Sequence, residues 1–220
     1  MTAAMVRSDV TFGEIFAGHG VLLDADRGET IFHPGAAADV VYLVETGMVK
    51  ISYLDESGKK LTLGLVGTDE IFGEMGLVGD KQQWHLATAI GMAIIRVVEI
   101  GEAMKAIASH EKGLQLLVEH FAARARRYEE SLEDLAFRDI EARLSRQLLA
   151  LADEFGEEIR DGTLIGLAIT HKELADMIGA VRENVTLALN RFVREGVIEK
   201  SRYRIVITDE GGLRKKISTS

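Results

Sequence analysis

The apolar residues change their spacing once along the chain, at about Glu102, and this change constrains the fold more than any other feature. From Gly28 to about Glu99, short runs rich in Val, Ile, Leu, Thr and Tyr are separated by turns containing Gly or Asp, which is typical of antiparallel strands. Beyond Glu102 the spacing becomes helical. We therefore predict an α+β protein with an N-terminal antiparallel β-roll, a long helix and a C-terminal part that is mostly helical.

A narrow apolar stripe marks the long helix. Its members follow one another at alternating steps of four and three, which keeps them on one helix face. Charged residues, Arg124 among them, flank the stripe, so we expect only the stripe to be buried. Such a seam is typical of a two-stranded coiled coil and predicts a homodimer, with packing of the stripe on its own domain as the alternative. The seam comprises Leu114, Val118, Phe121, Ala125, Tyr128, Leu132 and Leu135.

The C-terminal part combines helical spacing with short strands. A helix is predicted from Ile140 to Phe155, and the polar stretch 156–162 predicts a turn at a domain boundary. Two short helices with a Gly-containing turn and then two strands around a basic turn predict a winged helix-turn-helix. These segments are residues 170–180, 181–196 and 197–209, and the predicted domains are 1–112 (roll), 113–138 (long dimerisation helix and hinge) and 139–220 (winged helix-turn-helix).

Composition narrows the class of protein. The absence of cysteine excludes disulfides, thiolate zinc sites, cysteine-ligated iron–sulfur clusters and cysteine nucleophiles, and it suits a reducing cytoplasm. The N-terminal residues lack the pattern of a signal peptide, and the longest uncharged stretch, 82–95, is shorter than the roughly 18 residues of a membrane span. We predict a cytoplasmic protein with no membrane partner.

The net charge of -9 is unfavourable for a protein that binds nucleic acid, but the charge is unevenly distributed. Residues 1–140 carry 22 acidic and 13 basic side chains, whereas residues 141–220 carry 13 of each. The acidic excess therefore lies entirely outside the C-terminal part. This asymmetry permits nucleic-acid binding by the C-terminal part, and the sequence motifs must show whether such binding is expected.

Three segments in order resemble the CRP/FNR family of bacterial transcription regulators, and the resemblance extends from about Thr30 to Asp209. GTDEIFGEMGLVGD is similar to the Gly-Glu turn of the family's cyclic-nucleotide-binding roll. LEDLAFRDIEARLSRQLLALADEFG is similar to the hinge after the long helix, and ITHKELADMIGAVRENV to the helix-turn-helix. The resemblance implies a roll like a cyclic-nucleotide-binding jelly roll and a homodimer that binds double-stranded DNA. It also implies RNA polymerase as a partner.

The resemblance places the base-reading residues at the start of the second helix of the motif. Arg182 can donate two hydrogen bonds to a guanine, and Glu183 can accept one from a cytosine amine. The family's further arginine is replaced by Leu187, beside Thr186, and leucine contacts only a thymine methyl. We therefore predict altered specificity at that base pair. Phosphate contacts are predicted for Thr170, His171, Lys172, Asn190, Lys200 and Arg202.

The effector pocket departs from the family pattern. Gly73 and Glu74 are retained, but no arginine lies between Gly73 and Arg96, and the family's Arg-Ser pair becomes His85 and Leu86, or Trp84 and His85. The pair that contacts adenine is likewise replaced, near Tyr128 and Glu129. A buried cyclic phosphate would lack its charge-assisted partner, which argues against cyclic AMP. Another small molecule, haem held by His85 or another histidine, and no effector at all remain open.

Two other classes of function compete with this interpretation. A regulatory module of the same kind can control a partner protein through its helical part instead of DNA, in which case Arg182 has no role. An enzyme has no support, because no Gly-rich phosphate loop, zinc-ligand spacing or nucleophile elbow is present, so no catalytic or metal-binding residue is predicted.

Overall fold

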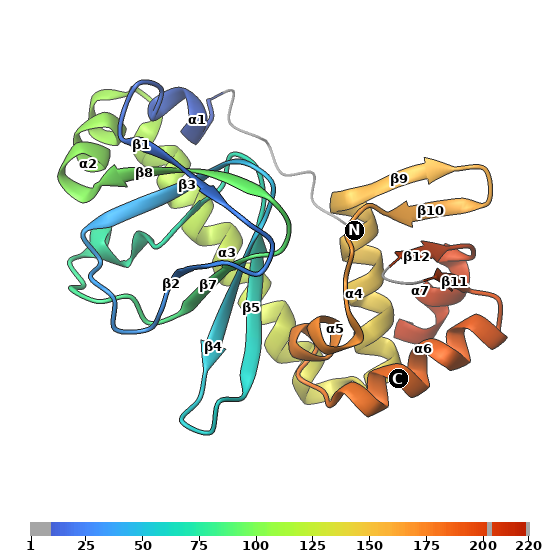
Figure 1. The fold of residues 1–220 in the computed structure, drawn as a ribbon. Helices are drawn as coiled ribbons and strands as arrows, with labels where there is room; N and C mark the ends of the chain where they lie inside the picture. The colour runs from blue at the N-terminus through green and yellow to red at the C-terminus, as the bar shows by residue number, and fades with distance from the viewer. Residues whose placement is uncertain (1–9, 202–203, 219–220) are drawn as a thin grey trace. The chain divides into compact units, whose positions relative to one another are not determined.

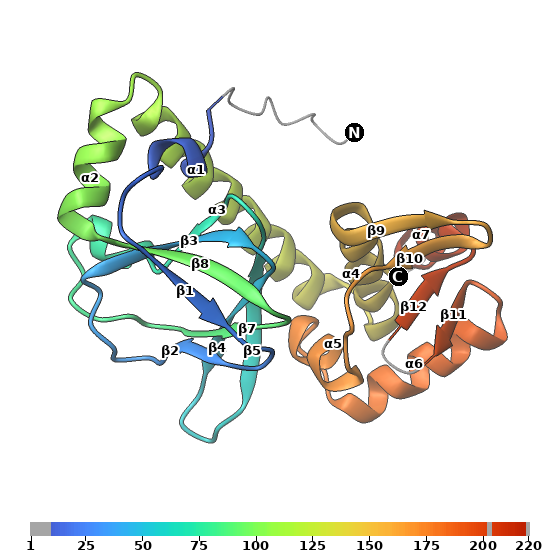
Figure 2. The same ribbon diagram turned by 45° about the horizontal axis from the view of Figure 1, so that its top comes forward.

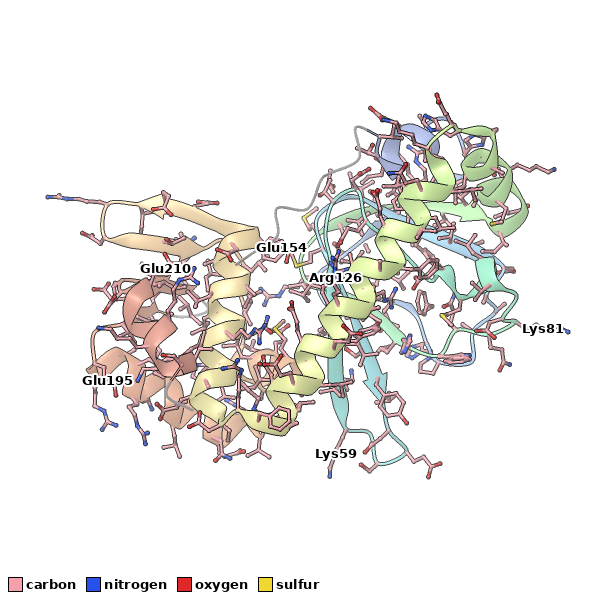
Figure 3. The ribbon with its side chains drawn as sticks, turned by 180° about the vertical axis from the view of Figure 1, so that it is seen from behind. Lys59, Lys81, Arg126, Glu154, Glu195 and Glu210 are labelled. Carbon is pink, nitrogen blue, oxygen red and sulfur yellow. The ribbon has the colours of Figure 1, made fainter. Side chains whose placement is uncertain are left out.

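The computed structural model describes residues 10–201 and 204–218. The chain forms two compact units, which divide within helix α3 (Gly113–Phe137). The first unit extends to Arg126 without residues 60–62, and the second contains residues 60–62 and everything from Arg127 onward. Figure 1 shows the elements in chain order, and Figure 3 marks Arg126 on α3, where the first unit ends.

The first unit is an antiparallel β-roll made of two four-stranded sheets. One sheet has the order β1-β8-β3-β6 and the other has the order β2-β7-β4-β5 (Figure 2). The strands are β1 (Val21–Ala25), β2 (Thr30–Phe32), β3 (Val40–Thr46), β4 (Val49–Leu54), β5 (Lys60–Val66), β6 (Ile71–Phe72), β7 (Leu86–Ala89) and β8 (Ala93–Glu99).

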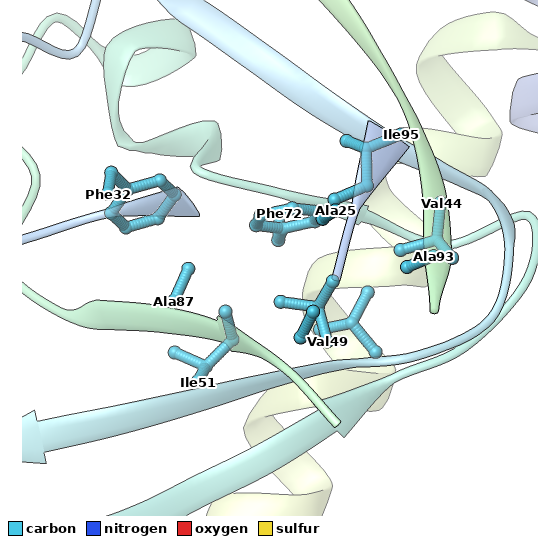
Figure 4. Close-up of a cluster of buried hydrophobic side chains, with 11 residues drawn as sticks. Ala25, Phe32, Val44, Val49, Ile51, Phe72, Ala87, Ala93 and Ile95 are labelled. Atoms are coloured by element: carbon cyan, nitrogen blue, oxygen red, sulfur yellow. The ribbon is translucent and has the colours of Figure 1, made fainter. Parts of the chain in front are cut away.

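The core of the roll lies between the two sheets. Inward-pointing side chains of the two sheets meet there, so that Val44 and Ile95 of one sheet share a cluster with Val49, Ile51 and Ala87 of the other (Figure 4). Phe32 and Phe72 add aromatic rings whose centroids lie 6.0 Å apart. These residues are buried in the structure, and all of them except Phe72 come from the runs that the sequence predicted as strands.

Helices cover the outer face of the sheet that contains β1. They are α1 (Phe12–Ile15), α2 (Ile100–Ser109) and the first turns of α3. Val41, Leu43 and Val98 face these helices and form a second buried cluster, against which Leu116 and Leu117 of α3 pack. The beginning of α3 is therefore held on the roll by residues that lie outside the predicted seam.

The second unit packs helices against a four-stranded sheet of order β11-β12-β10-β9. Leu148 of α4, Leu174 of α5, Phe192 of α6 and Leu213 of α7 are fully buried there. The elements are α4 (Ile140–Phe155), β9 (Gly156–Ile159), β10 (Gly162–Ile165), α5 (His171–Met177), α6 (Arg182–Arg194), β11 (Ile198–Ser201), β12 (Arg204–Ile207) and α7 (Glu210–Ser218).

The structure corrects the prediction for residues 156–162. They do not form a bare turn at a domain boundary: β9 pairs with β10 in a hairpin inside the second unit, with Arg160 and Asp161 between the strands. All four residues of β9 are exposed, so the segment carries no alternating pattern by which a strand can be recognised. The strand β1 and the helix α7 were also missed.

Candidate functional site

Two helices and the turn between them form the helix-turn-helix that the sequence predicted. Thr170 caps α5, since its hydroxyl oxygen accepts from the Glu173 amide at 3.1 Å while the Glu173 carboxylate accepts from the Thr170 amide at 2.7 Å. Gly179 in the turn has a φ of 61°, a left-handed conformation that glycine adopts without strain. The second helix, α6, begins at Arg182 as predicted.

The outer face of α6 carries the predicted base-reading residues. Val185, Ala188, Leu189 and Phe192 are buried and fix the inner face. At 3.6 residues per turn, the remaining predicted residues fall within about 140° of the helix circumference. Of these, Thr186 is half-buried and the others are exposed: Arg182, Glu183, Leu187 and Asn190.

Polar contacts connect this face with α5 and with β11. His171 Nδ1 lies 2.9 Å from Thr186 Oγ1, and Lys200 Nζ donates to Asn190 Oδ1 at 2.7 Å. The pKa of His171 is lowered by partial burial and by the positive charges of Lys200 and Arg182. The structure thus joins four of the predicted phosphate contacts and base readers in two pairs, one between α5 and α6 and one between β11 and α6.

Two of the other predicted phosphate contacts, Thr170 and Lys172, have partners of their own in the chain. The hydroxyl of Thr170 also donates to Glu173 Oε2 at 2.8 Å, and the Lys172 ammonium pairs with the buried Asp176 carboxylate. Arg202 lies outside the described residues. Arg204 is exposed at the start of β12.

Gly73 sits at a point of the roll where only glycine fits. Its φ is 71°, and a Cβ there would lie 2.7 Å from a ring carbon of Tyr42. The side chain of Gln83, which is buried, donates from Nε2 to the Gly73 carbonyl at 3.0 Å. Gln83 was not predicted, because a lone glutamine in a polar segment gives no signal in the sequence.

An arginine of the long helix forms an ion pair with the glutamate of the Gly-Glu turn. Glu74 follows Gly73 in a short 3₁₀ helix (Glu74–Val78), is 3% exposed and forms an ion pair with Arg124. The expectation that only the seam of α3 is buried is therefore wrong for Arg124, whose side chain is 14% exposed. A long side chain placed among charged residues shows no sign of burial in the sequence, because its partner lies 50 positions away.

The remaining predicted effector residues are distributed over both units. The pKa of His85 is lowered by burial and by the positive charge of Arg124, so the imidazole is neutral at pH 7. Leu86 belongs to β7 and is buried, whereas Trp84 is exposed. Tyr128 and Glu129 belong to the part of α3 that lies in the second unit, and their role at the effector site stays a prediction.

The seam of α3 is largely uncovered in the single chain. Leu114, Val118, Leu132 and Leu135 are 57%, 67%, 66% and 45% exposed. Ala125 is exposed, whereas Phe121 and Tyr128 are half-buried. The alternative in which the stripe packs on its own domain is therefore not realised at the exposed positions.

Neither a membrane span nor a metal site is found in the described residues. None of their helices combines the length and the hydropathy needed to cross a membrane. They also contain no group of three or more His, Asp or Glu side chains placed to hold a metal ion.

An antiparallel roll with a Gly-Glu turn, followed by a long helix and a winged helix-turn-helix, defines a DNA-binding transcription regulator. The family model for the cyclic nucleotide-binding domain matches residues 23–110, and the model for the Crp-like helix-turn-helix domain matches residues 142–216. The chain belongs to the CRP/FNR family, whose members are transcription regulators and not enzymes. The resemblance seen in the sequence is thereby confirmed.

Individual relatives extend over nearly the whole chain. A global nitrogen regulator of Synechococcus elongatus is 30% identical over 195 residues, which is 88% of either chain. A CRP-like cAMP-activated global transcriptional regulator of Mycobacterium tuberculosis is 31% identical over 88% of this chain and 87% of its own. The crystal structure of a CRP-family regulator of Thermus thermophilus matches with a TM-score of 0.78 at 28% identity, covering 89% of this chain and 96% of that one.

Proposed function

We propose that the protein is a homodimer that binds a specific, nearly palindromic DNA site with the helix beginning at Arg182, without control by cyclic AMP. The observation that carries this proposal is the exposed polar face of α6, on which Arg182 and Glu183 lie side by side with Thr186, Leu187 and Asn190. A helix presents such a face to base edges in the major groove. Lys200 and His171 flank it from β11 and α5 and supply contacts to phosphates.

The exposed seam of α3 supports the dimer. Apolar side chains in heptad spacing that are exposed along one face become buried when they pack against the same face of a second copy. Two copies related by a two-fold axis read two half-sites about 34 Å apart, one turn of the duplex. A near-palindromic site follows from this symmetry.

Leu187 determines the base preference at the base pair it faces, and selection of binding sites from random duplexes can detect this preference. Its side chain is 64% exposed on the DNA-facing side of α6 and can contact a thymine methyl but cannot hydrogen-bond a base. We predict that sites selected from random duplexes keep the bases read by Arg182 and Glu183 and lose the family's preference at the base pair facing Leu187. Recovery of an unaltered family consensus in both half-sites would contradict this prediction.

The Glu74–Arg124 ion pair supports independence from cyclic AMP. The arginine that this part of the roll gains already has a carboxylate partner, and both side chains are mostly buried. A cyclic phosphate would have to displace Glu74 and leave that carboxylate buried without a cation, which costs several kcal/mol. The activation by cyclic AMP that the name of the mycobacterial relative states is therefore not proposed for this chain.

Binding of the unliganded protein to a selected duplex over a range of salt concentrations tests the proposed function. We expect tight binding, with a log affinity that falls linearly as the log of the salt concentration rises, because binding releases counterions. Addition of cyclic AMP should not change the affinity. Cyclic AMP should also leave the thermal midpoint unchanged, whereas a ligand at 100 times its dissociation constant would add about 2.7 kcal/mol of stability. DNA binding that appears only with cyclic AMP would contradict effector independence.

RNA polymerase is the further partner that we propose, and the cytoplasm is the compartment. Both come with regulation of transcription by DNA binding in a bacterium. The competing function is a regulatory module that acts on a protein partner. It predicts no salt-dependent DNA binding, because such a module does not bind DNA.

A further inference from the structure

His171 and Thr186 form a contact whose hydrogen-bond roles can be assigned. Thr186 Oγ1 lies 2.9 Å from His171 Nδ1 and 2.9 Å from the carbonyl oxygen of Arg182, one turn earlier in α6. A hydroxyl has a single proton to donate, and a carbonyl oxygen can only accept. Thr186 therefore donates to Arg182, and His171 donates its Nδ1 proton to Thr186.

This assignment fixes the tautomer of the neutral imidazole. With the proton held on Nδ1, Nε2 carries an unshared electron pair and can only accept a hydrogen bond. A phosphate oxygen also only accepts, so neutral His171 has nothing to donate to it. Protonation adds an Nε2–H donor and a positive charge while the bond to Thr186 is kept.

The charged groups around His171 come from three elements. Partial burial lowers the pKa of His171, and the positive charges of Lys200 in β11 and Arg182 in α6 lower it further. On α5 itself, the Lys172 ammonium is paired with Asp176 and the Glu173 carboxylate accepts from Thr170. Burial and these charges favour the neutral imidazole in the free protein, and an added anion opposes their effect.

We propose that His171 takes up a proton when the helix-turn-helix binds a DNA phosphate, so that DNA affinity increases as the pH falls. The proposal rests on the proposed function, because the anion is the phosphate of the bound duplex. A phosphate stabilises the protonated imidazole and receives its new Nε2–H bond, and binding and protonation therefore reinforce each other. One proton is taken up per protomer.

The test is the affinity for one selected duplex between pH 8 and pH 6 at constant ionic strength. We expect the wild type to bind more tightly at lower pH, by up to about tenfold per pH unit for each protomer, the limit set by uptake of one proton. His171→Arg is expected to bind tightly with no such slope, because its charge is permanent, and His171→Gln to bind weakly with no slope. His33→Gln is the matched control, because His33 is exposed on the roll and has no assigned role, and it should retain the slope of the wild type.

Thr186→Val separates the proton from a merely structural role of His171. Without the hydroxyl, the neutral imidazole can carry its proton on Nε2 and donate to phosphate directly, so the pH dependence should become smaller while binding persists. Calorimetry in buffers of different ionisation enthalpy should show net proton uptake by the wild type and not by His171→Arg.

The outcomes distinguish the inference from the proposed function. Tight binding by the wild type without pH dependence, or a slope that His171→Gln retains, would overturn the inference and leave the DNA-binding function intact. Absence of binding to any selected duplex at every pH would overturn both.

Discussion

Replacing Arg182 by alanine is expected to weaken binding to the selected site by about 30-fold to 10⁴-fold. A bidentate arginine–guanine pair contributes about 1–3 kcal/mol of discrimination, and a dimer contains two such pairs. The side chain of Arg182 is exposed at the start of α6, so its removal should not disturb the buried face formed by Val185 and Phe192. Fluorescence anisotropy with the selected duplex measures the loss.

The control for Arg182→Ala removes the same charge elsewhere. Arg160 is exposed between β9 and β10, and Arg160→Ala should bind the selected duplex nearly as the wild type does. Arg182→Ala should lower the affinity for a duplex of scrambled sequence less than the affinity for the selected duplex, because the substitution removes only base reading. Equal affinity of Arg182→Ala and the wild type for the selected site would refute the assignment of α6 as the reading helix.

A charged residue in the seam of α3 is expected to convert the dimer into monomers. Leu132 is 66% exposed in the single chain, so Leu132→Glu should fold normally. In a dimer the two new carboxylates would be buried beside each other, which costs several kcal/mol and raises the dissociation constant by at least about 100-fold. Charged replacements of Phe121 or Tyr128 should act in the same direction. Sedimentation equilibrium measures the shift.

The matched control introduces the same charge one residue away. Ser131 is exposed beside the seam, and Ser131→Glu should leave the protein dimeric. DNA affinity should fall together with dimerisation in Leu132→Glu, because a monomer reads only one half-site. A dimeric Leu132→Glu with normal DNA affinity would show that the seam is not the dimer interface.

Elements with a strong periodic pattern were predictable from the sequence. The helix α4 has the predicted bounds, Ile140 and Phe155, because its apolar residues repeat at helical spacing after the N-cap Asp139. The strands β3, β4 and β8 were found because buried and half-buried apolar residues succeed one another between turns. The start of α6 followed from the resemblance to a known motif.

Other features depend on contacts that are distant in sequence. The strand β1 was not predicted from the sequence. Val21, Leu22 and Leu23 are all exposed, so inward and outward residues do not alternate along it. Arg124 was taken for a solvated residue because only the folded roll brings Glu74 to it. The contact of His171 with Thr186 joins two helices across a turn, and neither residue type indicates it by itself.

The most direct measurement of the proposed reading by paired helices uses the selected duplex with about five base pairs, half a helical turn, inserted between its half-sites. The insertion moves the second half-site to the opposite side of the duplex. A homodimer joined along α3 should then lose its tight binding and retain only the affinity of a single half-site, while the uninterrupted duplex binds two chains. Equal affinity for both duplexes would contradict two α6 helices held one turn apart.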